Sequence, residues 1–139
     1  MLLIRFFIFS ILLNSTLNDI PKDRSIFISP IRIPQLLSAN FGELRIDHFH
    51  SGLDIKTQGV TGKEVVAAAD GYIYRISITP GGFGNAIYIR HPSGYSTVYG
   101  HLERFNSKIE DYVRAQQYAK KSFQITLFPG RDEFPVKQG

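Results

Sequence analysis

The sequence contains no cysteine among its 139 residues. This absence excludes a disulfide framework, a thiolate metal site and a cysteine nucleophile. The chain also lacks the low hydrophobicity and high net charge of disordered proteins, because 43% of its residues are hydrophobic and its net charge is only +4. Its seven prolines and twelve glycines are scattered, which excludes a collagen-like or low-complexity chain. These properties indicate a folded chain with the length of one domain.

The positive charge is scattered along the chain, as on an ordinary soluble surface. A mild basic excess would also suit an anionic polymer such as nucleic acid, acidic lipid or cell wall. No nucleic-acid-binding module is recognised, so nucleic acid is not expected as a partner. The glycine-rich run at residues 81–84 lacks the Lys-Ser/Thr pair and the helix of a phosphate-binding loop, which favours a hairpin loop.

Residues 1–13 form an apolar run interrupted only by Arg5 and Ser10. A membrane-spanning helix needs about 20 apolar residues, so no stable membrane span is expected here. The run and the polar residues after it resemble a secretory signal peptide, although Arg5 lies inside the run and no Ala-x-Ala cleavage site follows. The alternatives are a buried element of the domain or a wrongly assigned start. We expect a signal peptide at residues 1–20 and one domain at residues 21–139.

The rest of the chain favours short strands. Prolines at positions 30 and 34 break the first apolar pieces into extended lead-in segments, and loop and strand are expected over residues 35–48. Turn residues separate the later apolar runs, and His91-Pro92-Ser93-Gly94 has the proline and glycine positions of a type I turn. Strands are predicted at residues 65–69, 72–78, 86–90, 95–101 and 123–127, with a further element from residue 134. This spacing predicts an all-β sandwich or barrel.

One helix is predicted inside this β pattern. Ser107 and Glu110 form a capping box, in which each side chain can bond to the other residue's backbone amide. Ile109, Tyr112 and Val113 then recur at helical spacing, so the helix is expected to run from Ser107 to about residue 119.

His50 and Asp54 are candidate metal ligands, because neutral imidazole and carboxylate are ordinary ligands of zinc and other first-row metals. On a regular strand, residues four apart lie about 13 Å apart, so the two could share an ion only if Ser51-Gly52 bends the chain. Taken alone, the pattern is weak and favours a surface histidine and a capping aspartate over a metal site.

His101 follows Tyr99 at the end of a predicted strand. Strand alternation would place Tyr95, Thr97, Tyr99 and His101 on one face. A histidine beside tyrosines could transfer protons, and it could equally be a half-buried strand residue. Of the other histidines, His48 could share the His50 face as a spare ligand, but a position at the surface or next to the ligands is favoured. Residue 91 is expected to support its turn.

These pieces occur in a particular order along the chain. The ordered segments are His50-Ser51-Gly52-Leu53-Asp54-Ile55, Ala67-Ala68-Ala69-Asp70-Gly71, Gly84-Asn85-Ala86-Ile87-Tyr88-Ile89, His91-Pro92-Ser93-Gly94-Tyr95 and Tyr99-Gly100-His101-Leu102. This order resembles the lysostaphin/LytM-type zinc metallopeptidases, which are peptidoglycan endopeptidases with a compact antiparallel β fold. The resemblance covers about residues 40–105, with a plausible continuation to the last residue.

The resemblance implies a specific chemistry. His50 and Asp54 would be two zinc ligands, and His101 would be catalytic, either activating the zinc-bound water or stabilising the oxyanion. The reaction would be amide hydrolysis in the peptide stems and cross-bridges of peptidoglycan, by a water whose pKa the zinc lowers toward about 7. An exported protein of the periplasm or cell envelope is therefore expected.

The sequence also departs from that family. The family completes its site with a downstream His-x-His motif, which supplies the third zinc ligand and a catalytic histidine. No histidine follows His101 within these 139 residues, although residues 136–139 look like the approach to that motif. The simplest interpretation is truncation, with weak zinc binding and impaired activity. The alternatives are a non-catalytic module that binds wall peptides or activates another hydrolase, and an inert fragment.

Overall fold

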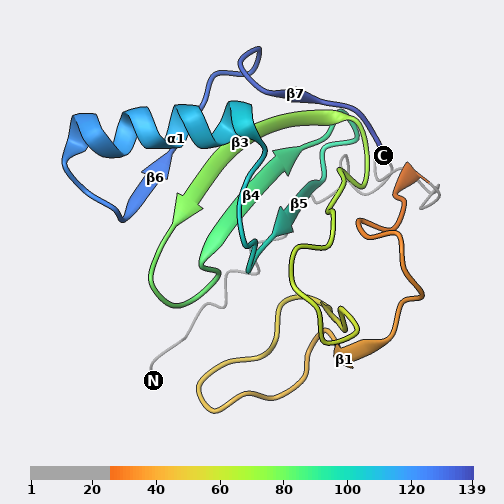
Figure 1. Ribbon diagram of the computed structural model, residues 1–139. Helices are drawn as coiled ribbons and strands as arrows, with labels where there is room; N and C mark the ends of the chain where they lie inside the picture. Colours follow the sequence, from red (N-terminus) through yellow and green to blue (C-terminus); the bar gives the residue numbers. More distant parts are fainter. Residues whose placement is uncertain (1–25) are drawn as a thin grey trace, which may run out of the picture.

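The computed structural model describes residues 26–139, so the predicted signal peptide lies outside the described residues (Figure 1). Its elements are β1 (Leu37–Ala39), β2 (Asp54–Ile55), β3 (Gly71–Ile78), β4 (Asn85–Arg90), β5 (Ser96–Tyr99), α1 (Ser107–Lys120), β6 (Ile125–Leu127) and β7 (Pro135–Val136). Among the described residues, no helix is long and apolar enough to cross a membrane.

The main sheet has five antiparallel strands. Strands β5, β4, β3 and β6 follow one another across it, and β7 pairs with β3 as well. Strands β6 and β7 share one edge of β3, with β6 opposite residues 76–78 and β7 opposite residues 71–72. A separate antiparallel pair joins β1 to β2. The predicted fold class, a mostly antiparallel β domain with one helix, is confirmed.

The hydrophobic core lies between the main sheet and α1 (Figure 1). Ile73 and Ile76 of β3 both belong to it, although residues three apart on a regular strand point to opposite faces. A register shift between Ile73 and Arg75 resolves this, because a bulge inserts one residue and returns both isoleucines to the same face. Val113 of α1 is almost completely buried against them.

The N-cap of helix α1 is one residue earlier than the sequence predicts. Asn106 is the N-cap, and its side-chain Oδ1 accepts the backbone N–H of Ile109 at 3.0 Å. The Glu110 carboxylate reaches back to the N–H of Phe105 at 2.7 Å. The prediction of Ser107 as the cap is wrong, because the asparagine before it already supplies the acceptor that the first turn needs.

Several predicted strands are shorter or absent. Residues 65–69 form no strand, because their backbone bonds go instead to the lead-in segment, from Val66 N–H to Pro30 O and from Ile28 N–H to Ala68 O. Residues 35–48 contain only β1 and an isolated bridge from Leu44 to Phe49. The strand predicted at residues 123–127 is limited to β6, and the one predicted at residues 95–101 is limited to β5.

Candidate functional site

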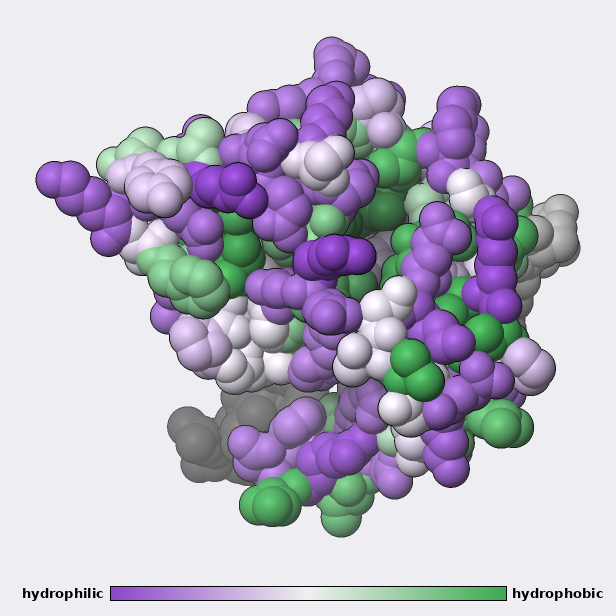
Figure 2. Space-filling view, in the orientation of Figure 1, coloured by the Kyte–Doolittle hydropathy of each residue, from purple (hydrophilic) through white to green (hydrophobic). Residues whose placement is uncertain are grey.

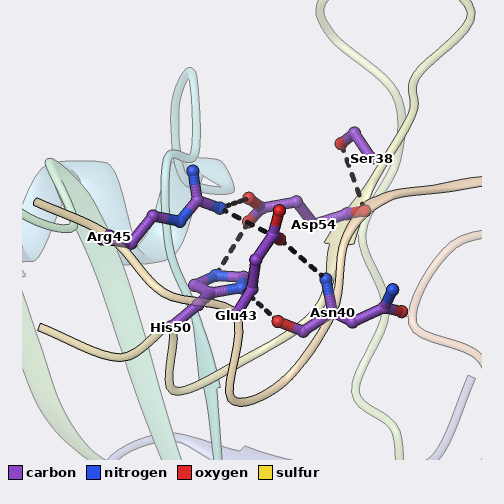
Figure 3. A network of polar contacts seen from close by, with 6 residues as sticks. All are labelled: Ser38, Asn40, Glu43, Arg45, His50 and Asp54. Carbon is purple, nitrogen blue, oxygen red and sulfur yellow. Dashed lines mark hydrogen bonds and ion pairs between the residues drawn. The ribbon is translucent and has the colours of Figure 1, made fainter.

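His50 and Asp54 lie side by side, as Figure 3 shows, with His50 Nε2 3.2 Å from Asp54 Oδ1. Each is fixed to the same neighbouring segment of chain. The backbone of His50 bonds to Gly42 and Glu43, and Asp54 in β2 pairs with Ala39 in β1. The chain therefore bends between His50 and Asp54. Such a bend is what would allow the two side chains to bind one ion.

Glycine's special freedom is not what produces this bend. Gly52 is absent from the glycines with positive φ, so its backbone conformation is one that other residues also adopt. The pairing of both flanks with residues 39–43 holds the bend instead.

The ring nitrogens of His50 have different partners. Nδ1 lies 3.0 Å from the backbone carbonyl oxygen of Asn40, which can only accept, so Nδ1 carries the proton and donates it. In a neutral ring, Nε2 then presents a lone pair to the Asp54 carboxylate, and two acceptors 3.2 Å apart repel each other. Either a second proton or a bound cation removes this repulsion. A metal-ligating histidine usually donates its other ring N–H to a backbone carbonyl or carboxylate, and the bond from His50 Nδ1 to the Asn40 carbonyl fits this arrangement, with Nε2 left for a metal.

Two further residues orient this pair. Arg45 Nη2 donates to Asp54 Oδ2 at 3.1 Å, which leaves Oδ1 turned toward His50. Glu43 lies 3.8 Å from the same guanidinium and also accepts the Asn40 N–H at 3.2 Å. The Arg45 and Asp54 side chains are 39% and 43% exposed, so their ion pair contributes little stability. The effect of this ion pair is to orient the Asp54 carboxylate.

The donor set fits zinc, which readily takes an imidazole nitrogen and a carboxylate oxygen. Catalytic zinc sites usually have three protein ligands and a water. Residues 26–139 contain no group of three or more His, Cys, Asp or Glu side chains that could hold a metal. The described residues therefore offer His50 and Asp54 as a ligand pair and no third ligand. Their assignment as metal ligands stays a prediction.

His101 is exposed and stands outside β5, with a positive φ of 54°. The strand predicted through His101 is wrong, because β5 ends at Tyr99, so strand alternation does not set the direction of the His101 side chain. This conformation costs a residue other than glycine about 1–2 kcal/mol, and such strain is concentrated at functional sites. His101 forms no metal-binding cluster with His50 and Asp54 in the described part of the chain. Its catalytic role stays a prediction.

Tyr99 has a structural role in a buried polar chain. His91, only 3% exposed, lies 2.8 Å through Nδ1 from the Asp70 carbonyl oxygen and 2.8 Å through Nε2 from Thr97 Oγ1. The Thr97 hydroxyl is 3.0 Å from the Tyr99 hydroxyl, which accepts the Ala68 N–H at 2.8 Å. A neutral His91 satisfies every member if Tyr99 donates to Thr97 and Thr97 donates to Nε2. The expectation that His91 supports the structure is confirmed.

His48 lies at the surface, as expected. Its side chain is 64% exposed and pairs with the neighbouring Asp47. That histidine holds the pKa of Asp47 below its ordinary value, chiefly through the side-chain hydrogen bond and then through its charge. This local pair is separate from the contacts of His50.

Comparison with known proteins gives partial matches to much longer chains. An uncharacterized metalloprotease of Haemophilus influenzae is 35% identical over 78 residues, which is 56% of this chain and 15% of that protein. The DD-carboxypeptidase/endopeptidase Mpg of Neisseria meningitidis is 43% identical over 65 residues, or 47% of this chain and 14% of that protein. The protein of the same name from Neisseria gonorrhoeae is 42% identical over 57 residues, or 41% of this chain and 13% of that protein.

The chain thus spans between 13% and 15% of the length of these curated relatives. No solved structure matches it. The model of peptidase family M23 matches residues 48–121, more than half of the chain, and this range includes His50, Asp54 and His101. The chain therefore belongs to peptidase family M23.

Proposed function

We propose that this M23 peptidase domain is a zinc-dependent endopeptidase that hydrolyses the peptide cross-links of bacterial peptidoglycan. The observation that carries the proposal is the contact of His50 Nε2 with Asp54 Oδ1, together with the carbonyl that holds His50 Nδ1. Family membership supports a peptidase, and the name of one relative, a metalloprotease, supports a metal. The name endopeptidase of the Neisseria relatives supports internal cleavage.

Each side chain has a defined part in this proposal. His50 and Asp54 hold the metal, the Asn40 carbonyl fixes the His50 tautomer, and Arg45 orients the Asp54 carboxylate. A bound zinc ion would polarise the scissile carbonyl and lower the pKa of its water toward about 7. His101 takes or returns a proton, or stabilises negative charge developing on the substrate oxygen.

The substrate and the location of the protein belong to the same proposal. The net charge of +4 suits an anionic polymer, and peptidoglycan carries carboxylates along its peptide stems. A signal peptide at residues 1–20 would place the domain in the periplasm or cell envelope, where this polymer lies. N-terminal sequencing of the native protein tests this location, and recovery of intact Met1 in the cytoplasm would contradict it.

The ligand count predicts weak zinc binding by these 139 residues alone. The test is zinc titration and peptidoglycan digestion, on this chain and on the chain extended by a Pro-His-Leu-His-Phe-Glu strand. The extension should raise both affinity and hydrolysis, and its double His→Ala form should not. Stoichiometric zinc and rapid hydrolysis by the unextended chain would contradict the ligand count. Zinc binding without hydrolysis by the extended chain would favour the non-catalytic wall-binding module.

Substitutions in the extended chain separate the assigned roles. His50→Ala and Asp54→Ala should abolish zinc binding and hydrolysis together. His101→Ala should keep zinc and lower kcat by about 10²–10⁴-fold, as expected for loss of a proton-transfer group. His48→Ala is the matched control and should change neither property. Among the described residues, the His48 side chain pairs only with the exposed Asp47, and its backbone carbonyl, which accepts the Arg45 N–H, is kept in alanine.

A further inference from the structure

The loop between β3 and β4 contacts the segment that carries His101. The Phe83 carbonyl oxygen accepts the His101 N–H at 2.8 Å. The ring of Phe83 lies against Gly100, where an added Cβ would come within 3.0 Å of Phe83 Cδ1. One residue of the loop therefore supports both the backbone of His101 and the residue before it.

Asn85 holds the segment on the other side of His101. Its carbonyl oxygen accepts the Leu102 N–H at 3.0 Å. Its side-chain amide donates to the carbonyl oxygens of Leu102 and Glu103, at 3.0 and 3.3 Å. Three bonds from Asn85 thus fix the chain immediately after the left-handed residue.

These contacts hold the chain beyond the last hydrogen-bonded pair of β4 and β5. The last pair between β4 and β5 is Ile87 with Tyr99, so alternation no longer sets the direction of residues 100–103. Within the described residues, the His101 imidazole has no hydrogen-bond partner of its own. Of the hydrogen bonds in this part of the chain, only those of the backbone place His101, and that backbone is held by Phe83 and Asn85.

We infer that Phe83 and Asn85 are positioning residues for His101, with the end of the loop between β3 and β4 and the first residue of β4 together acting as a clamp on its backbone. This inference rests on the catalytic role proposed for His101. It predicts that loosening the clamp lowers kcat in the extended chain and leaves KM and zinc affinity unchanged, because the residues proposed to bind zinc are held by other segments of the chain.

Asn85→Asp is the sharpest variant, because it keeps the shape and replaces the amide donor with a carboxylate facing two carbonyl oxygens. We expect kcat to fall by about tenfold or more, as for other small displacements of a catalytic group. Asn106→Asp is the matched control. It makes the same chemical change at a helix N-cap, where aspartate caps as well as asparagine, and activity should stay unchanged.

A second pair of variants covers the case in which Asn85→Asp fails to fold. Phe83→Ala removes the ring that lies against Gly100 and should lower kcat. Phe83→Tyr keeps that ring, so kcat should stay unchanged. Phe128→Ala, at another exposed phenylalanine, is the control for loss of an aromatic ring and should have no effect on kcat.

A readout independent of activity is the three-bond coupling between the His101 amide and Hα protons, which reports φ in the metal-free 139-residue chain. We expect this coupling to change in Asn85→Asp and Phe83→Ala, and to be unchanged in Asn106→Asp. An unchanged coupling and kcat in folded Asn85→Asp and Phe83→Ala would overturn the clamp. A changed coupling, with no hydrolysis by the unsubstituted extended chain, would overturn the proposed function and leave the clamp supported.

Discussion

The two parts of the candidate site lie in regions that are built differently. His50 and Asp54 belong to residues 26–69, where strands have two or three residues and large apolar side chains are exposed. Figure 2 shows several such side chains at the lower surface, near the loop of residues 40–50 in Figure 1. His101 is attached to the sheet, and every residue of the main core cluster comes from residue 73 onward.

This difference separates stability from metal chemistry. The sheet and α1 bury the core and therefore dominate the free energy of unfolding. The region around His50 depends on a few backbone bonds and exposed ion pairs, which contribute little to that free energy. Substitutions near His50 should therefore change metal binding without unfolding the domain, and substitutions in the core should unfold it.

The largest expected effect comes from the core. Ile76 is fully buried, and Ile76→Ala should lower the free energy of unfolding by about 2–5 kcal/mol, because it leaves a cavity. The matched control is Ile46→Ala, in which an isoleucine of the other region is fully exposed; its effect should stay within about 0.5 kcal/mol. Denaturant unfolding measures both, and equal losses would remove the contrast between the regions.

The buried polar chain gives the next largest effect. Tyr99→Phe removes the hydroxyl that accepts the Ala68 N–H, and a buried donor without a partner costs about 1–3 kcal/mol. Tyr118→Phe is the control, because Tyr118 is 78% exposed, and it should cost almost nothing. Thermal unfolding compares the two variants. If Tyr99→Phe were as stable as the unsubstituted chain, the hydroxyl would have no structural role.

The helix cap predicts a smaller and more local loss. Asn106→Ala removes the acceptor for the Ile109 N–H and should cost about 1 kcal/mol. Ser107→Ala should cost less, because Ser107 is the first helical residue and not the cap. Denaturant titration distinguishes the two, and a larger loss for Ser107→Ala would restore the capping box predicted from the sequence.

The smallest effect concerns pH and the C-terminal residues. The hydrogen bond from Lys137 and the backbone N–H of Gln138 hold the pKa of Asp70 below its ordinary value of 3.8. Because the pKa of Asp70 is lowered in the folded state, this contact stabilises the fold at pH values above the ordinary pKa of 3.8. The contribution disappears as the pH falls through the lower pKa of the folded state. Asp70→Asn should slightly reduce the melting temperature at neutral pH and weaken its fall at acid pH. Identical pH profiles would show that the contact contributes nothing.

Regular elements with strong local signals were predicted well from the sequence. The strands at residues 72–78 and 86–90 and the helix from Ser107 were found, because alternation and helical spacing are local properties. The strand predicted at residues 65–69 was wrong, since its backbone partners lie in the proline-broken lead-in segment. The end of β5 was missed because a histidine only occasionally adopts a left-handed conformation, so its residue type is a weak signal for one.

The site was predicted in part. His50 and Asp54 were found through their residue types and the resemblance to one family, and the structure places them in contact. Asn40 was missed because it acts through a backbone carbonyl, which every residue has. Arg45 was missed because its contact with Asp54 spans nine residues of irregular chain.

The central claim is that the His50–Asp54 pair is the metal-binding half of the site. The most direct test is a zinc titration of the 139-residue chain, followed by NMR of the imidazole resonances of its four histidines. Zinc should shift the Nε2 resonance of His50 first, Asp54→Ala should abolish this shift, and His101→Ala should preserve it. Zinc binding that shifts His48 or His91 instead, or that persists unchanged in Asp54→Ala, would contradict the assignment of His50 and Asp54 as metal ligands.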